Sequence, residues 1–155
     1  MTREQLSKKE LKELSKQLEG CGLICTFSKK DKVVKIDGKI LSVNGELDYI
    51  FYEEKIYPSL KLVLRKGVAD FRKITVDDGA IRFVINGADI MRPGVVDIDD
   101  DISIGDFIVI ADKTHGKPLA VGVSLYSSDD MQKLEKGKVA ANIHHIGDAL
   151  WTMEI

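Results

Sequence analysis

The side chains that could do chemistry fall into three small groups, and the first is a run of aspartates. Asp97, Asp99 and Asp101 stand at the first, third and fifth positions of a calcium-loop frame. The sixth position of that frame is Ile102, where the loop needs glycine, and the twelfth is Ile108, where it needs a bidentate glutamate. The pattern therefore favours an acidic, solvated turn over a calcium site.

The two cysteines form the second group. Cys21 and Cys25 are separated by three residues, and no second pair of metal ligands has matching spacing. Structural zinc sites use four ligands, so this spacing favours ordinary buried thiols over a zinc site. Two cysteines also make no disulfide framework, which fits a reducing compartment. We expect a cytoplasmic protein without a metal or other cofactor.

The third group lies near the end of the chain, at His144, His145 and Asp148. On a strand, adjacent histidines point to opposite faces, which is a poor arrangement for joint chelation. His145 and Asp148 could form an acid–base pair, but no nucleophile or phosphate-binding loop accompanies them. We therefore expect a protein that is not an enzyme. Trp151 is expected to pack at a barrel rim, with stacking on a nucleic-acid base as the alternative.

The elements that must position these groups begin with a helix, because Leu11, Leu14 and Leu18 recur on one helical face. Its expected boundary residues are two capping-box pairs and two terminating glycines, Thr2–Gln5, Ser7–Glu10, Gly20 and Gly22. Short β-like runs follow at Leu23–Phe27, Val33–Ile36, Ile40–Val43 and Leu47–Tyr52, with Asn44-Gly45 as a hairpin turn. The stretch from Pro58 is a short helix or a strand, and proline at a first turn favours the helix.

The second half alternates strands with two short helices. A strand begins at "KITV", and a helix capped by Asp77 or Asp78 ends at Asn86-Gly87. Strands rich in β-branched residues are expected at Val95–Ile98, Phe107–Ile110 and Leu119–Leu125. A second capped helix lies in "SSDDMQKLEKG", and one or two closing strands lie in "VAANIHHIGDALWTMEI". Short strands with glycine turns indicate a small barrel or sandwich carrying two helices.

Composition and charge describe a folded protein of one ordinary domain or two small ones. Of its 155 residues, 44% are hydrophobic and 31% are charged, and no apolar run reaches the roughly 20 residues of a membrane helix. The N-terminus is charged and lacks the apolar core of a signal peptide. Through Arg72 there are 15 Lys+Arg against 11 Asp+Glu, and from Lys73 onward 8 against 14. This shift from +4 to −6 predicts an α+β domain at 1–72 and a β-barrel domain at 73–155.

The breaker-rich run "RFVINGADIMRPGVVDIDDDISIGDFIVIAD" resembles the PUA domain, a small pseudobarrel of RNA-handling proteins. The segments "VNGELDYIF", "YPSLKLVLRKG", "VDDGAIRFVINGADIMRPG" and "NIHHIGDALW" resemble the malignant-T-cell-amplified-sequence family of translation factors and its archaeal relatives. That resemblance covers nearly the whole chain. It implies an α+β fold in which an N-terminal α+β domain precedes a C-terminal PUA pseudobarrel with two short helices.

The resemblance also implies RNA binding, because PUA domains usually hold RNA beside the first helix and its glycine-rich loop. The RNA-binding residues expected on this ground are Arg82, Asn86, Gly87, Ala88, Asp89, Arg92, Pro93 and Gly94. Arg82 and Asn86 share a helix face, where they could contact a phosphate and a sugar or base edge. Each residue also has an ordinary explanation, since Gly87 suits a helix end and Pro93-Gly94 suits a turn.

The partners that the resemblance implies are ribosomal RNA of the small subunit, transfer RNA, or both, in initiation, re-initiation or recycling. A translation-factor protein could bind the N-terminal domain. The lysines of the first half are either a solvated surface or a second contact with that RNA, and they lie at Lys8, Lys9, Lys12, Lys16, Lys29, Lys30, Lys32, Lys35 and Lys39. Two other functions stay open, a protein-binding adaptor and an accessory subunit of an RNA-modifying enzyme.

Overall fold

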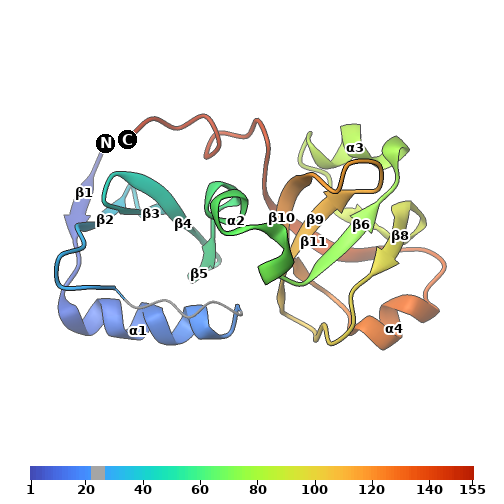
Figure 1. Ribbon diagram of the computed structural model, residues 1–155, viewed down its shortest axis with the longest axis horizontal. Coiled ribbons are helices and arrows are strands. Elements are labelled where there is room, and N and C mark those ends of the chain that lie inside the picture. Colours follow the sequence, from blue (N-terminus) through green and yellow to red (C-terminus); the bar gives the residue numbers. More distant parts are fainter. Residues whose placement is uncertain (22–26) are drawn as a thin grey trace.

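The computed structural model describes residues 1–21 and 27–155 and shows two sheets side by side (Figure 1). The first sheet has the strand order β1-β2-β3-β4-β5, and every pairing between neighbouring strands is antiparallel. Its strands are β1 (Arg3–Gln5), β2 (Val33–Ile36), β3 (Ile40–Val43), β4 (Glu46–Tyr52) and β5 (Lys55–Pro58). Two helices accompany it, α1 (Lys8–Glu19) and α2 (Leu60–Lys66).

Helix α1 begins where the sequence predicts, but only one of the two expected capping pairs is used. The Ser7 hydroxyl accepts from the Glu10 N–H, and the Glu10 carboxylate accepts from the Ser7 N–H, which completes a capping box. Thr2 instead donates its N–H and hydroxyl to the Asp37 carboxylate, which ties β1 to the β2–β3 turn. Gly20 ends the helix as predicted. The expected strand at 23–27 lies, apart from Phe27, outside the described residues, as do Gly22 and Cys25.

Of the three hairpin turns in the first sheet, the sequence predicted the one between β3 and β4 and missed the one between β4 and β5. Asn44 and Gly45 both have positive φ, 54° and 85°, as a two-residue hairpin turn requires. A second such turn at Glu53 and Glu54, with φ of 49° and 66°, leads into β5, which the sequence did not predict. The stretch after Pro58 is a helix, as favoured. Its N-cap is Ser59, whose hydroxyl accepts from the Leu62 N–H.

The second sheet has the order β7-β11-β10-β9-β6-β8 and forms the predicted pseudobarrel with two short helices. The strands are β6 (Lys73–Val76), β7 (Ile90–Met91), β8 (Val95–Ile98), β9 (Phe107–Asp112), β10 (Pro118–Ser124) and β11 (Lys138–His145). The helices are α3 (Asp78–Val84) and α4 (Ser128–Lys133), with short 3-10 turns η1 (Val68–Asp70) and η2 (Arg92–Gly94). Strands β6 and β9 pair in parallel, and β7 was not predicted. No described helix is long and apolar enough to cross a membrane.

Two hydrophobic cores meet at strand β9. Its Phe107 and Val109 belong to the core of the first half, whereas Ile108 and Ile110 belong to the core of the barrel. This division follows from the two-residue period of a strand, which sends alternate side chains to opposite faces. The Phe107 ring stacks on Tyr57 at 6.2 Å between ring centroids. The two halves are therefore joined by a shared apolar layer.

The C-terminal segment 146–155 returns from the barrel to the first half, so that the two chain ends lie side by side (Figure 1). Five apolar residues of this segment pack against the first core, Ile146, Leu150, Trp151, Met153 and Ile155. Trp151 thus packs on the first half, with the Lys61 ammonium 5.3 Å from its ring centroid. It is partly buried there. The sequence had suggested a position at the barrel rim, and that prediction was wrong.

Candidate nucleic-acid interface

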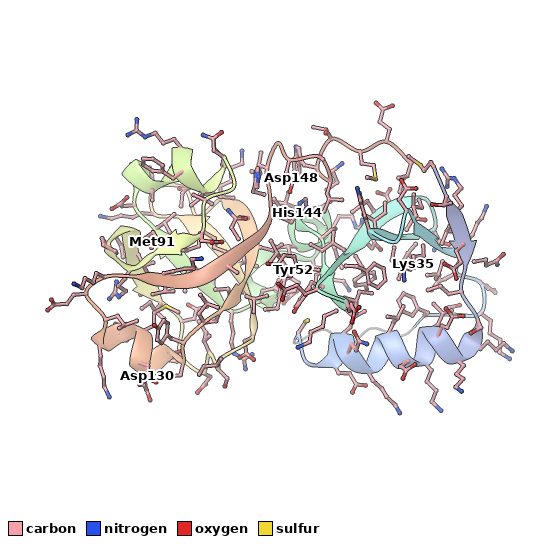
Figure 2. The ribbon with its side chains drawn as sticks, turned by 180° about the vertical axis from the view of Figure 1, so that it is seen from behind. Lys35, Tyr52, Met91, Asp130, His144 and Asp148 are labelled. Carbon is pink, nitrogen blue, oxygen red and sulfur yellow. The ribbon has the colours of Figure 1, made fainter. Side chains whose placement is uncertain are left out.

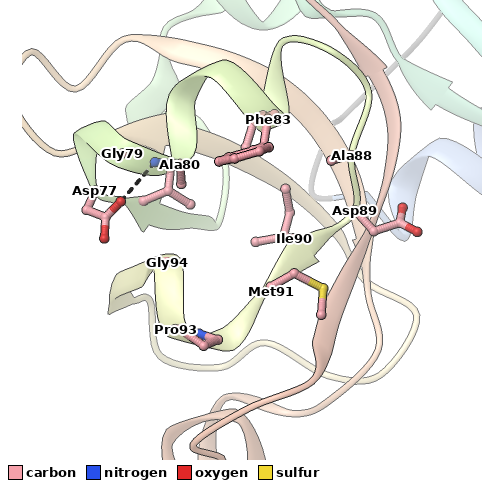
Figure 3. Close-up of a pocket in the computed structure, with 12 residues that line it drawn as sticks. Asp77, Gly79, Ala80, Phe83, Ala88, Asp89, Ile90, Met91, Pro93 and Gly94 are labelled. Carbon is pink, nitrogen blue, oxygen red and sulfur yellow. Dashed lines mark hydrogen bonds between the residues drawn. The ribbon is translucent and has the colours of Figure 1, made fainter.

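Helix α3 and the segment that follows it enclose an apolar cavity of about 460 Å³, which we call the α3 groove (Figure 3). Asp77 caps α3 by accepting from the Ala80 N–H at 2.9 Å, and its own N–H donates to the Gly94 carbonyl. A Cβ on Gly94 would lie only 3.1 Å from the Ala80 Cβ. The helix and η2 therefore approach closely on one side, and the groove opens on the other.

The groove is lined mainly by apolar side chains, and two large ones are open to solvent. Phe83 is 54% exposed and Met91 is 50% exposed, although both are large and hydrophobic. Ile90, which is buried, and Pro93, which is exposed, also line the groove (Figure 3). Together they place exposed apolar surface at the rim of the groove, a feature found at contact sites when it forms a continuous patch. Neither Phe83 nor Met91 was among the binding residues predicted from the sequence.

Four of the eight predicted RNA-binding residues line the α3 groove, namely Ala88, Asp89, Pro93 and Gly94. Arg82 lies just outside it, exposed, with its guanidinium 4.8 Å from the Phe83 ring centroid. Among the described residues, no carboxylate lies within ion-pair distance of Arg82. Its charge is therefore available to a phosphate at the mouth of the groove.

The other predicted polar residues hold the loop together. The Asn86 amide donates to the Arg82 carbonyl at 2.6 Å and closes the helix end. Asp89 accepts from the Lys138 ammonium and from the Asn142 N–H, both at 2.9 Å, across to β11. The hydrogen bond from Lys138 lowers the pKa of Asp89, and this effect outweighs the opposing effect of burial. Asp89 is therefore a charged anchor of the loop.

The Arg92 side chain is also engaged in hydrogen bonds within the fold. Its Nε donates to the Met131 carbonyl and its guanidinium NH1 donates to the Val95 carbonyl, each at 2.9 Å. From the sequence, Arg92 was predicted as an RNA contact on the loop between Gly87 and Gly94, and that prediction stays untested. Gly87 has a φ of 90°, and a Cβ there would lie 3.2 Å from the His145 Nε2, so a side chain would be strained.

Asn142 on β11 shapes this loop although no sequence signal pointed to it. Its amide nitrogen donates to the Val84 carbonyl at 2.9 Å and to the Ala88 carbonyl at 3.0 Å. These bonds tie the end of α3 and the loop after it to β11, and the Val84 carbonyl also accepts from the Gly87 N–H. Asn142 and its acceptors lie more than fifty residues apart in sequence, so only the folded chain reveals them. In the sequence, Asn142 is an ordinary polar residue on a strand, and no pattern predicts that it holds the loop.

Several of the described residues that were first considered for metal or acid–base chemistry make contacts within the fold. Asp99 accepts from the Lys73 N–H at 2.8 Å, and Asp101 is exposed with a φ of 63°. Within residues 1–21 and 27–155, no three His, Cys, Asp or Glu side chains are placed to hold a metal ion together. Burial, aided by the Asp106 carboxylate, raises the pKa of the Cys21 thiol to about 11.

The histidine that pairs with Asp148 is His144, where the sequence suggested His145. His144 is 1% exposed, and its Nδ1 lies 2.8 Å from the Asp148 Oδ2 where the two halves meet (Figure 2). Asp148 also accepts from the His145 and Trp151 N–H groups. Burial raises the pKa of Asp148, but these hydrogen bonds outweigh it and hold the pKa below its ordinary value. The pair anchors the start of the C-terminal segment.

Comparison with known proteins assigns both halves. Residues 72–146 match the PUA domain, and residues 2–66 match the Domain of unknown function (DUF1947). The protein "Uncharacterized protein MJ1432" of Methanocaldococcus jannaschii is 35% identical over 159 residues, which cover 96% of this chain and 94% of that protein. The crystal structure of hypothetical protein PH0734.1 from Pyrococcus horikoshii OT3 is 32% identical, with a TM-score of 0.81 over 97% of this chain and 98% of that one.

Eukaryotic relatives are also similar over most of the chain. "Translation machinery-associated protein 20" of Saccharomyces cerevisiae is 33% identical over 132 residues, which cover 80% of this chain and 72% of that protein. "Malignant T-cell-amplified sequence 1-A" of Xenopus laevis is 40% identical over 123 residues, which cover 75% and 66%. The chain therefore belongs to the family of PUA-domain proteins that includes Translation machinery-associated protein 20, the malignant T-cell-amplified sequence proteins and their archaeal relatives.

Proposed function

We propose that this protein binds RNA in the translation apparatus through the α3 groove. The observation that carries the proposal is the exposed Phe83 ring at the mouth of an apolar cavity, beside the Arg82 guanidinium, which makes no ion pair within the described residues. Aromatic faces stack on nucleobases, and arginine contacts phosphates, so the two neighbouring side chains suit the two parts of a nucleotide. Membership of the PUA-domain family supports the same reading.

The shape of the groove favours an unpaired base over a duplex edge. Its volume of about 460 Å³ lies in the usual range for small-ligand pockets, roughly 300–1,000 Å³. Its walls carry no lysine or arginine, so phosphate is better bound outside, at Arg82. A base turned out of a loop or from a chain end would insert between Phe83 and Met91. Single-stranded loops and ends are the usual targets of sequence-specific RNA recognition.

The RNA we propose belongs to the small ribosomal subunit, to transfer RNA, or to both. The names of the eukaryotic relatives refer to the translation machinery, which supports this choice and a cytoplasmic site of action. The proposed role lies in initiation, re-initiation or subunit recycling and requires no catalysis by this chain. A translation-factor protein is proposed as a second partner, bound through the first half.

Crosslinking in cell extract, followed by sequencing of the bound RNA, tests this function and names the target. The matched variants are Phe83→Ala in the groove and Ile104→Ala elsewhere, since Ile104 is also an exposed apolar residue at 70% exposure. Loss of one stacked base should cost roughly 1–3 kcal/mol, or about 5- to 150-fold in affinity, for Phe83→Ala alone. Recovery of no ribosomal or transfer RNA above background, or equal affinity of both variants, would reject the proposal.

A further inference from the structure

The first two turns of helix α1 place two lysines on one flank and two glutamates on another. Lys8 and Lys12 line one side of the helix, together with Leu11, along an open cavity of about 620 Å³. Glu10 and Glu13 lie on the other flank, above a smaller hollow. This separation follows from the helical period, which brings residues four apart to the same side. One flank of α1 is therefore basic although the helix as a whole carries both signs.

The opposite wall of the larger cavity adds a further positive charge and an aromatic ring. Lys29 and Phe27 line it from the segment before β2, and we call this cavity the α1 groove. The Phe27 ring is fixed edge-on against Tyr49, with 5.9 Å between ring centroids. Asp31 also lines the groove, but its carboxylate accepts from the Ser28 N–H and the Asn44 amide. Its oxygens are thus occupied by the loop itself.

The positive charge of the α1 groove is not neutralised by the fold. Within the described ranges, Lys8, Lys12 and Lys29 have no carboxylate within ion-pair distance, whereas Lys138 and Arg65 are paired. Like charges four residues apart, as at Lys8 and Lys12, destabilise a helix slightly. The unneutralised lysines beside an apolar floor form a surface that is suited to binding a polyanion.

We propose that the α1 groove is a second RNA-contacting surface, which binds the sugar–phosphate backbone of a segment that does not enter the α3 groove. This inference rests on the proposed function. Lys8 and Lys12 are separated by about 6 Å along the helix axis, and a nucleic-acid strand presents a phosphate about every 3.4 Å of its axis. Phe27 and Leu11 form the floor, on which a base or sugar can lie. A basic groove with an aromatic floor is the usual arrangement for single-stranded RNA.

An acidic protein segment is the competing occupant, and the aromatic floor favours RNA over it. The two grooves lie at opposite ends of the molecule, α1 beside the first sheet and α3 on the barrel (Figure 1). One RNA strand in both grooves would therefore run along the whole protein, or two RNA segments would be held together. In both cases the salt dependence of binding reports both surfaces.

The test uses the full chain, bulk transfer RNA and a salt titration of the binding constant. The variant carries Lys8→Gln, Lys12→Gln and Lys29→Gln. The control carries the same net charge change at three scattered exposed lysines outside that set, Lys55→Gln, Lys66→Gln and Lys136→Gln. The slope of log K against log salt is negative. Loss of three phosphate contacts should make it shallower by about 2, at roughly 0.7 to 0.9 per contact. The control should change it far less.

The outcomes separate this inference from the proposed function. A variant with the slope and affinity of the control overturns the α1 groove, while loss of binding in Phe83→Ala would still support the α3 groove. Failure of the wild-type chain to bind transfer RNA and ribosomal RNA overturns both. Polyglutamate is the second probe. If the triple lysine variant loses binding to polyglutamate but not to RNA, the α1 groove binds acidic protein segments and the inference is wrong.

Discussion

The Nε of Arg92 donates a hydrogen bond of 2.9 Å to the carbonyl oxygen of Met131, at the fourth helix. Through this bond, and through a second one to the Val95 carbonyl, a single side chain joins η2, β8 and α4. Arg92 connects the wall of the α3 groove to the body of the barrel. Arg82 makes no comparable link, so the two arginines predicted as RNA contacts have different roles.

Replacing Arg92 should therefore affect stability more than replacing Arg82. In Arg92→Ala two partly buried carbonyls lose their donor, which should lower the free energy of unfolding by about 1–3 kcal/mol. Arg82→Ala should change it by at most about 0.5 kcal/mol, as is usual for an exposed side chain. Urea unfolding of both variants measures the difference, and equal stability would show that the Arg92 hydrogen bonds contribute little.

The proposed division at residues 72 and 73 can be tested by a fragment that begins at Arg72. We expect the fragment to unfold cooperatively, but at a lower temperature than the full chain, because Phe107 loses its contact with Tyr57. Phe107→Ala should cost about 3–5 kcal/mol in the full chain and much less in the fragment. Calorimetry of the four proteins measures this, and a fragment without a cooperative transition would contradict the division.

The pKa of Asp148 predicts how stability changes in acid. Because its pKa is lowered in the fold, the carboxylate stabilises the protein above the ordinary value of 3.8 and loses this effect as the pH falls below it. Asp148→Asn should be less stable at pH 7, where the charged acceptor is missing, and should show a shallower loss between pH 5 and pH 2. Thermal unfolding across that range is the measurement, with Asp97→Asn, an exposed aspartate, as the control. Parallel pH curves for wild type and Asp148→Asn would contradict the assignment.

Cys21 should be slow to react although it is a free thiol. A rise in pKa from 9.0 to about 11 leaves about 100-fold less thiolate at pH 8. Alkylation by iodoacetamide in a Cys25→Ser background should therefore be about 100-fold slower in the native protein than in urea. The rate can be followed by mass spectrometry, and comparable rates in both states would show that Cys21 is accessible and ionises normally.

Local signals in the sequence were sufficient for much of the fold. The Asn44-Gly45 hairpin, the helix with its leucine face and the Asp77-capped helix were predicted because each depends on neighbours in the chain. The turn at Glu53 and Glu54 was missed, since glutamate rarely adopts positive φ and gives no turn signal. Strand β7 has two residues, too few for a periodic pattern to show.

The site was predicted less completely because its members are joined over long sequence distances. The loop 87–94 was found from its glycines and its resemblance to PUA domains, yet the roles of Arg92 and Asn142 depend on partners 39 to 58 residues away. The exposure of Phe83 was also invisible, because a short apolar helix does not reveal which of its large side chains is left uncovered. Tertiary packing alone decided that.

The C-terminal segment has a consequence for how the protein folds during synthesis. The core of the first half is completed by Ile146 and Leu150, which are synthesised after the strands of the barrel. Domains usually fold as they emerge, from the N-terminal end. Here part of the apolar surface of the first half stays uncovered until residues 146–155 have been synthesised. A chain that stops before residue 146 would therefore leave that surface exposed.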